Sequence, residues 1–256
     1  MKAEVKGTTM PVLEMMLDPG EALISTHGEL SWMSANMQLT QTLNASGQSG
    51  SGGLMAGLKR AIGGGGLMLT KYEAVNGTGM ISFAAKVPGR IFPIDIEPSL
   101  GYSCHRHGWV CGTPGITPSV GFQQTFTGGL WGGDGFLLQK LDGQGTAYIE
   151  LSGEITTYDL GPGQTIMAHP GHVGLFQNSV SFTTQRLPGI MNRAFGKDGH
   201  HLAVLTGPGK IWLQSMPIPI LAHAVGEYIG GGESGRDAAA GGVAGGLLGG
   251  VLGRGL

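Results

Sequence analysis

Apolar residues in this chain recur in short runs that are separated by glycine-containing turns. The run from Phe136 to Leu138 precedes a Gly143-x-Gly145 motif, and the run from Tyr148 to Leu151 follows it. Short apolar runs bounded by turn residues are typical of β-strands, and glycines between two such runs are typical of a hairpin turn. The pattern therefore predicts an all-β protein in which tight turns join successive strands.

Two kinds of turn motif recur at matching intervals. The segment from Leu17 to Leu23, which contains a Pro-Gly turn, matches the segment from Leu160 to Ile166 without gaps, and a weaker copy centres on Pro98. The first match extends to Met33 against Phe176. In such turns proline sets φ and glycine takes the position with positive φ. The second motif, Gly-x-Gly, stands at residues 77–79, 143–145 and 207–209.

These two motifs share a period and predict three internal repeats. Successive Gly-x-Gly motifs are 66 and 64 residues apart, and a fixed period is the signature of a repeated structural unit. We expect one β domain over residues 1–229, built from repeats at about 10–85, 86–152 and 153–220.

Two glycine-rich segments depart from this pattern. In the insert at residues 46–66, Leu54, Leu58 and Ile62 have the spacing of a short amphipathic helix, and a second brief helix is expected near residues 220–229. The tail at residues 230–256 places glycines at every fourth position, a spacing used by packed membrane helices. This spacing leaves two interpretations of the tail: a flexible segment, or a segment that contacts a membrane or another copy of the chain. The glycines concerned are Gly241, Gly245, Gly249 and Gly253.

Composition narrows the class of protein. Glycine accounts for 50 of 256 residues and charged residues for 12%, which excludes a helical bundle. The longest uncharged apolar stretch, from Ala238 to Gly253, is shorter than the roughly 20 residues that span a bilayer. The amino-terminal residues have no signal-peptide pattern. We therefore expect a cytoplasmic protein that can associate with membranes peripherally, and the net charge of −2 argues against nucleic acid as a partner.

The two cysteines are expected to be reduced. If residues 102–111 form a single strand, the Cα atoms of Cys104 and Cys111 lie about 23 Å apart at roughly 3.3 Å per residue. That distance is too long for a disulfide bond. Trp32, Trp109 and Phe176 fall in similar parts of the repeats and are expected in the strand core.

Histidines supply the candidate chemistry. His105 and His169 occupy equivalent positions in the second and third repeats, where the first repeat has Thr26, and His107 lies two residues from His105. If the repeats surround an axis, three imidazoles could converge as metal ligands. Alternatively, these histidines lie at a polar strand edge or at a contact between subunits and bind no metal. Gly230-x-Gly232-x-x-Gly235 has no βαβ unit around it, so no cofactor is expected.

The motifs resemble one known family. The succession of Pro-Gly turn, apolar strand and Gly-x-Gly, ending in the segment from Gly207 to Ser215, is similar to the mitochondrial-biogenesis family named for altered inheritance of mitochondria, in its bacterial type. The resemblance implies a double-stranded β-helix like that of the tryptophan RNA-binding attenuation protein. It also implies a protein without an assigned reaction.

Three functions follow from these observations. The first is a non-catalytic, self-associating β scaffold that contacts membranes through its glycine-rich segments. The second is a cupin-like metal-dependent enzyme that uses His105, His107 and His169. The third, RNA binding, rests on analogy of fold alone.

Overall fold

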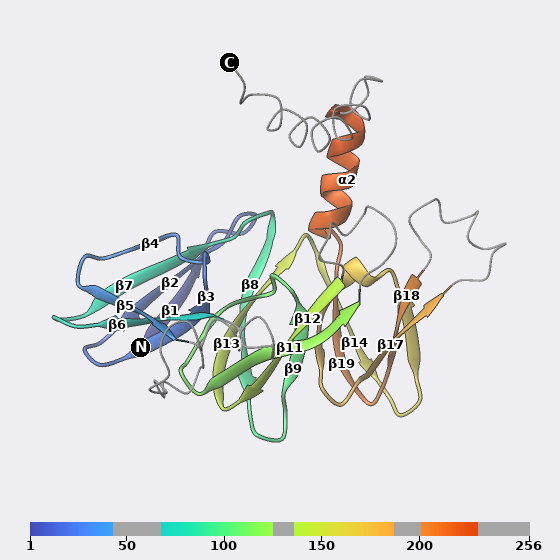
Figure 1. The fold of residues 1–256 in the computed structure, drawn as a ribbon, viewed down its shortest axis with the longest axis horizontal. Coiled ribbons are helices and arrows are strands. Elements are labelled where there is room, and N and C mark those ends of the chain that lie inside the picture. Colours follow the sequence, from blue (N-terminus) through green and yellow to red (C-terminus); the bar gives the residue numbers. More distant parts are fainter. Residues whose placement is uncertain (43–67, 125–135, 187–200, 230–256) are drawn as a thin grey trace, which may run out of the picture. The chain divides into compact units, whose positions relative to one another are not determined.

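The computed structural model describes residues 1–42, 68–124, 136–186 and 201–229 of the chain (Figure 1). The described residues are predominantly β-strand and all strand pairings among them are antiparallel, which confirms the predicted all-β class. The chain divides into two compact units, residues 1–218 and 219–256. Every strand in the described part of the chain belongs to the first unit.

The strands follow one another with short connections. The amino-terminal strands are β1 (Lys2–Lys6), β2 (Val12–Leu17), β3 (Ala22–Thr26), β4 (Trp32–Met33), β5 (Met37–Thr42), β6 (Leu69–Ala74) and β7 (Gly79–Ala84). The next are β8 (Gly89–Ile96), β9 (Tyr102–His105), β10 (Trp109–Gly112), β11 (Ile116–Gln124), β12 (Phe136–Gly143) and β13 (Gly145–Ser152). The last are β14 (Ile155–Leu160), β15 (Thr165–Ala168), β16 (Val173–Gln177), β17 (Ser181–Arg186), β18 (His201–Thr206) and β19 (Gly209–Gln214).

Four sheets result, and their strand orders are related. The first is β1-β2-β7-β4, the second β5-β6-β3-β10-β13-β8, the third β11-β12-β9-β16-β19-β14 and the fourth β15-β18-β17. Adding six to each strand number of the second sheet gives the order of the third. The same shift turns β2-β7-β4 into β8-β13-β10, and β9-β12-β11 into β15-β18-β17. We call strands whose numbers differ by six counterpart strands.

Burial along the strands reflects their place in these sheets. Edge strand β8 alternates buried Ile91, Ile94 and Ile96 with exposed Arg90 and Asp95, as expected when one face is covered. Central strand β10 is buried at every position because both of its faces are covered.

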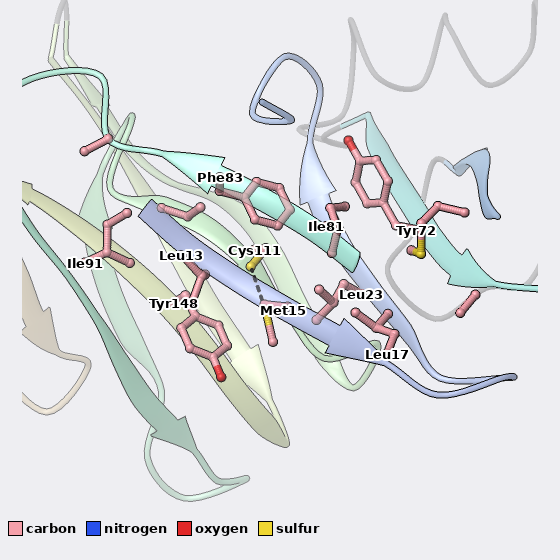
Figure 2. Packing of buried hydrophobic residues seen from close by; sticks show 14 residues of the cluster. Leu13, Met15, Leu17, Leu23, Tyr72, Ile81, Phe83, Ile91, Cys111 and Tyr148 are labelled. Carbon is pink, nitrogen blue, oxygen red and sulfur yellow. Dashed lines mark hydrogen bonds between the residues drawn. The ribbon is translucent and has the colours of Figure 1, made fainter. Parts of the chain in front are cut away.

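Three apolar clusters lie between successive sheets. The first cluster joins the first and second sheets, and Figure 2 shows its side chains, with Leu13, Met15 and Phe83 facing Tyr148 and Cys111. The second cluster joins the second and third sheets around Trp109 and Leu141, and the third joins the third and fourth sheets around Phe136 and Leu205. Each fully buried leucine or isoleucine contributes roughly 1.5–3 kcal/mol. The first and fourth sheets are therefore the end layers of the unit.

The Pro-Gly turns form as predicted. The Glu21 amide donates a hydrogen bond to the Asp18 carbonyl at 2.9 Å, and Gly20 has a φ of 84°. The matching turn places the Gln164 amide 3.0 Å from the Gly161 carbonyl, with Gly163 at 78°. These angles lie in the left-handed region that favours glycine.

The Gly-x-Gly motifs are not hairpin turns, contrary to the sequence-based expectation. They do contain glycines with positive φ, such as Gly77, Gly143 and Gly209. However, the strands on either side of each motif belong to different sheets: β6 and β7, β12 and β13, and β18 and β19. The glycines are therefore corners where the chain crosses from one layer to the next.

Both cysteines are buried free thiols, in agreement with the predicted reduced state. The reasoning from one continuous strand was wrong, because the chain turns between His105 and Trp109 and forms two strands, β9 and β10, in different sheets. The Cys111 thiol packs against the Met15 sulfur at 4.0 Å (Figure 2).

The helix expected near residues 220–229 is present as α2 (Ile218–Ile229), and Tyr228 on it is exposed. The insert at residues 46–66, with Leu54, Leu58 and Ile62, lies outside the described residues, and so does the tail with Gly241, Gly245, Gly249 and Gly253.

Candidate functional site

A carboxylate is buried in the interior of the β unit. Glu150, in the middle of β13, is 4% exposed, and its Oε1 accepts a hydrogen bond of 2.9 Å from the backbone amide of Lys86. The Lys86 ammonium in turn contacts both carboxylate oxygens of Glu29, at 2.5 and 2.7 Å. Two acidic groups thus share one lysine residue, Glu150 through its backbone and Glu29 through its side chain.

Desolvation dominates the electrostatics of this group. Burial raises the pKa of Glu150, and the hydrogen bond and charge of Lys86 offset only part of that rise. The negative charge of Glu29 raises it further. In the sequence, Glu150 lies in an apolar run that predicts a strand, and no role was predicted for it. An acidic residue in the buried run Tyr148–Leu151 was the signal that could have identified it.

His105 lies at the end of β9 and contacts the backbone of Glu150. Its Nε2 lies 3.3 Å from the carbonyl oxygen of Glu150, and its Nδ1 accepts a hydrogen bond of 3.4 Å from the backbone amide of His107. This pattern assigns the ring proton to Nε2. Burial lowers the pKa of His105 to about 4. Burial, followed by the charges of Lys86 and Arg106, also lowers the pKa of His107.

His169 belongs to a second pair of histidines. Its Nδ1 caps the 3₁₀ turn Pro170–His172 by accepting a hydrogen bond of 3.4 Å from the Gly171 amide. The rings of His169 and His172 have centroids 6.0 Å apart, and Nδ1 of His172 lies 2.8 Å from the carbonyl of Gln214. The structure thus pairs His105 with His107 and His169 with His172.

The predicted three-histidine centre is not assembled in the described part of the chain. No group of three or more His, Cys, Asp or Glu side chains in those ranges lies close enough to hold a metal ion. His105 also lacks a free nitrogen, because one ring nitrogen accepts from His107 and the other donates to Glu150. The imidazole therefore closes the turn between β9 and β10 onto β13.

Apolar side chains are exposed on strands of the two end sheets. Trp32 on β4 is 47% exposed and Met167 on β15 is 46% exposed, whereas Val5 and Met16 are exposed on β1 and β2. The sequence predicts that Trp32, Trp109 and Phe176 lie in the strand core. Trp109 and Phe176 are buried, but the expectation was wrong for Trp32.

The reason for this exception lies in the sheet order. Strand β4 is the edge of the first sheet, whereas its counterparts β10 and β16 are central. Trp32 pairs with Ser82, three residues after Gly79, and the corresponding positions on β10 and β16 are Cys111 and Leu175. Both of those side chains are fully buried.

Within the ranges that the structure describes, no helix is both long and apolar enough to cross a membrane.

Comparison with known proteins identifies relatives of the whole β unit. Residues 3–216 match the family model described as mitochondrial biogenesis AIM24. The crystal structure of a protein from Streptococcus pyogenes is similar in fold, with a TM-score of 0.70 and 20% sequence identity. The alignment covers 89% of this chain and 99% of that one. Among curated proteins, none matches this chain.

Proposed function

This chain belongs to the mitochondrial biogenesis AIM24 family, and from that premise we propose that it is a non-catalytic, self-associating β scaffold. The observation that carries the proposal is the exposure of large apolar side chains on both end sheets, Val5, Met16 and Trp32 on the first and Met167 on the fourth. Apolar surface on strands without a covering layer is a common site of association.

We also propose that the scaffold is a chain of three β repeats with the double-stranded β-helix of the tryptophan RNA-binding attenuation protein. The shift of six in strand numbering supports the repeats, since β2–β7, β8–β13 and β14–β19 fall within the intervals 10–85, 86–152 and 153–220. Recurrence of the positive-φ glycines at the layer corners supports them further.

The polar cluster fits a structural role in this proposal. Glu150 and His105 direct their polar atoms at backbone groups of Lys86 and His107, and the Glu150 carbonyl meets His105. A buried group satisfied in this way holds turns against strands.

Native mass spectrometry of the full-length protein tests self-association. We expect assemblies at whole multiples of the chain mass of 26.4 kDa that dissociate on dilution. A single-chain mass over a roughly hundredfold range of protein concentration would contradict the scaffold.

Membrane contact through the glycine-rich segments is the second half of the proposal. Flotation with liposomes tests it in the full chain, in a variant lacking residues 230–256 and in one lacking residues 50–64. The deletions should reduce flotation. Flotation that is absent in the full chain, or unchanged in both variants, would remove the membrane role and leave self-association to stand on mass spectrometry.

A further inference from the structure

Two equivalent strand pairings join the repeats inside the unit, and a third pairing of the same kind is missing from the strands that the structure describes. Strand β3 pairs with β10, and its counterpart β9 pairs with β16. Strands β3, β9 and β15 are counterparts, and so are β4, β10 and β16. The two pairings therefore leave β15 without a partner of the second kind and β4 without a partner of the first kind. Among the described residues, β15 pairs only with β18, and β4 pairs only with β7.

Other edges of the four sheets do not share this property. Strands β5, β11 and β17 are edges in every sheet in which they occur. Strands β8 and β14 are also edges, although their counterpart β2 lies between β1 and β7, and β1 is the remaining edge. Strands β4 and β15 differ from these edges because their counterparts pair with each other inside the unit, β10 with β3 and β16 with β9. Their open hydrogen-bonding sides therefore correspond to sides that are paired twice within the same unit.

The two internal joins use the same register. Gly112 lies opposite Ile24 in the first join, and Phe176 lies opposite Ser103 in the second. Gly112, Phe176 and Met33 are counterparts, since each pairs with the residue two positions after the second glycine of a Gly-x-Gly motif. Ile24 and Met167 correspond in the gapless match that runs from Leu17. The register thus places Met33 opposite Met167.

Resting on the proposed self-association, we propose that β15 of one copy pairs antiparallel with β4 of a second copy, with Met167 opposite Met33 and Ala168 opposite Trp32. The fourth sheet of one copy and the first sheet of the next then form one continuous sheet. The second sheet and the third sheet each contain an equivalent join, between β3 and β10 and between β9 and β16. The partner is a second copy because its β4 matches both the register and the apolar character of β15.

Exposure of side chains supports this occupant. Ile24, the counterpart of Met167, is 1% exposed because the third sheet covers it, and Cys111 and Leu175, the counterparts of Trp32, are fully buried. Head-to-tail addition supplies the missing layer at both ends: Met167 gains the second sheet of the next copy, and Trp32 the third sheet of the previous one. A head-to-tail contact is heterologous and builds rings or filaments.

Cysteine cross-linking tests the register. Met33→Cys and Met167→Cys are prepared as separate full-length proteins, mixed and oxidised. Cα atoms of directly opposed residues lie about 4.5–5.5 Å apart, within reach of a disulfide. We expect a cross-linked dimer in the mixture and little in either protein alone, because the native thiols are buried. Met10→Cys, at an exposed site outside the strands, replaces Met33→Cys in the control mixture.

Lysine variants test the contribution of the edges. Trp32→Lys and Met167→Lys should each raise the concentration of half-dissociation at least tenfold, since a charge on an edge strand opposes pairing. Met10→Lys should leave it unchanged.

The outcomes separate this inference from the proposed function. Assemblies that persist in both lysine variants, with no cross-link in the mixture, would overturn the β4–β15 contact and leave the scaffold intact. A disulfide formed within one chain of the double variant Met33→Cys, Met167→Cys would also overturn it. Absence of any assembly of the unaltered protein would overturn both.

Discussion

The carbonyl oxygen of Glu150 lies 3.3 Å from Nε2 of His105, so the end of β9 is tied to the middle of β13. These strands belong to different sheets, and the contact therefore bridges two layers. The neutral imidazole of His105 and the buried carboxylate of Glu150 make the stability of the unit depend on pH.

His105 should make the protein less stable at acidic pH. The folded protein keeps this ring neutral until its pKa of about 4, whereas the unfolded chain protonates it near 6.5. The unfolded state binds more protons between these values, so stability decreases as pH falls from about 6.5 to about 4. The decrease should be about 2–3 kcal/mol for this group. Urea unfolding measured across that pH range should show that the free energy of unfolding of His105→Gln changes less with pH than that of the unaltered protein. The same pH dependence of the free energy of unfolding in the variant and the unaltered protein would show that the fold does not hold the His105 ring neutral.

Glu150 should act in the opposite direction. Its folded pKa is raised above the ordinary 4.5, so its contribution to stability is present below about pH 4.5 and is lost as pH rises through the folded value. Glu150→Gln keeps an oxygen that can accept from the Lys86 amide and removes the charge. We expect it to be at least as stable as the unaltered protein at pH 8, with the difference shrinking at pH 4.5.

Glu150→Leu is the matched variant that separates charge from hydrogen bonding. It removes the acceptor of the Lys86 amide and should cost roughly 1–3 kcal/mol at pH 4.5, where Glu150→Gln costs little. Identical denaturation midpoints for the two variants at that pH would contradict a role for the hydrogen bond.

Two glycines should respond differently to alanine. A Cβ atom at Gly89 would meet the backbone carbonyl oxygen of Leu151 on the neighbouring strand, so Gly89→Ala should cost more than about 2 kcal/mol. Gly163 has a φ of 78° but open space around it, so Gly163→Ala should cost about 1 kcal/mol. Thermal unfolding of the two variants compares them. A larger loss at Gly163 would mean that backbone conformation outweighs the close approach.

Neither thiol should react in the folded protein. Cys104 and Cys111 are buried, and burial raises the pKa of Cys104 to about 12 and that of Cys111 well above its ordinary value. A thiol reagent should label no cysteine in buffer and two in 6 M guanidinium, with native labelling limited by unfolding. Rapid modification of one cysteine in buffer would reveal local opening of its layer.

Sequence reasoning reached the class and the turn chemistry but not the layer arrangement. Local rules identify the turn at Gly20, because a positive φ after proline depends on two adjacent residues. They misassigned Gly143, since a hairpin and a crossing between layers require the same permissive backbone and differ only in distant strand pairing. The exposure of Trp32 escaped them for the same reason. An aromatic residue in a strand is buried only when a neighbouring strand and layer cover it.

The candidate site was located only in part. Histidine spacing singled out His105 and His169 as candidate metal ligands that converge on an axis, whereas each ring meets a different set of backbone groups. Glu150 was overlooked because its neighbours in the sequence are apolar. Its partner Lys86 is 64 residues away along the chain.

The shared sheets also set an order of events during synthesis. The first sheet can be completed once residue 84 has emerged from the ribosome, but β3 then waits with an open side until β10 follows, and that sheet needs residue 152. Pairing between strands so distant in sequence is slow. In a crowded polysome, the open side of β3 is therefore exposed to β10 of a neighbouring nascent chain, and exchange of strands between chains is the misfolding hazard that this architecture carries.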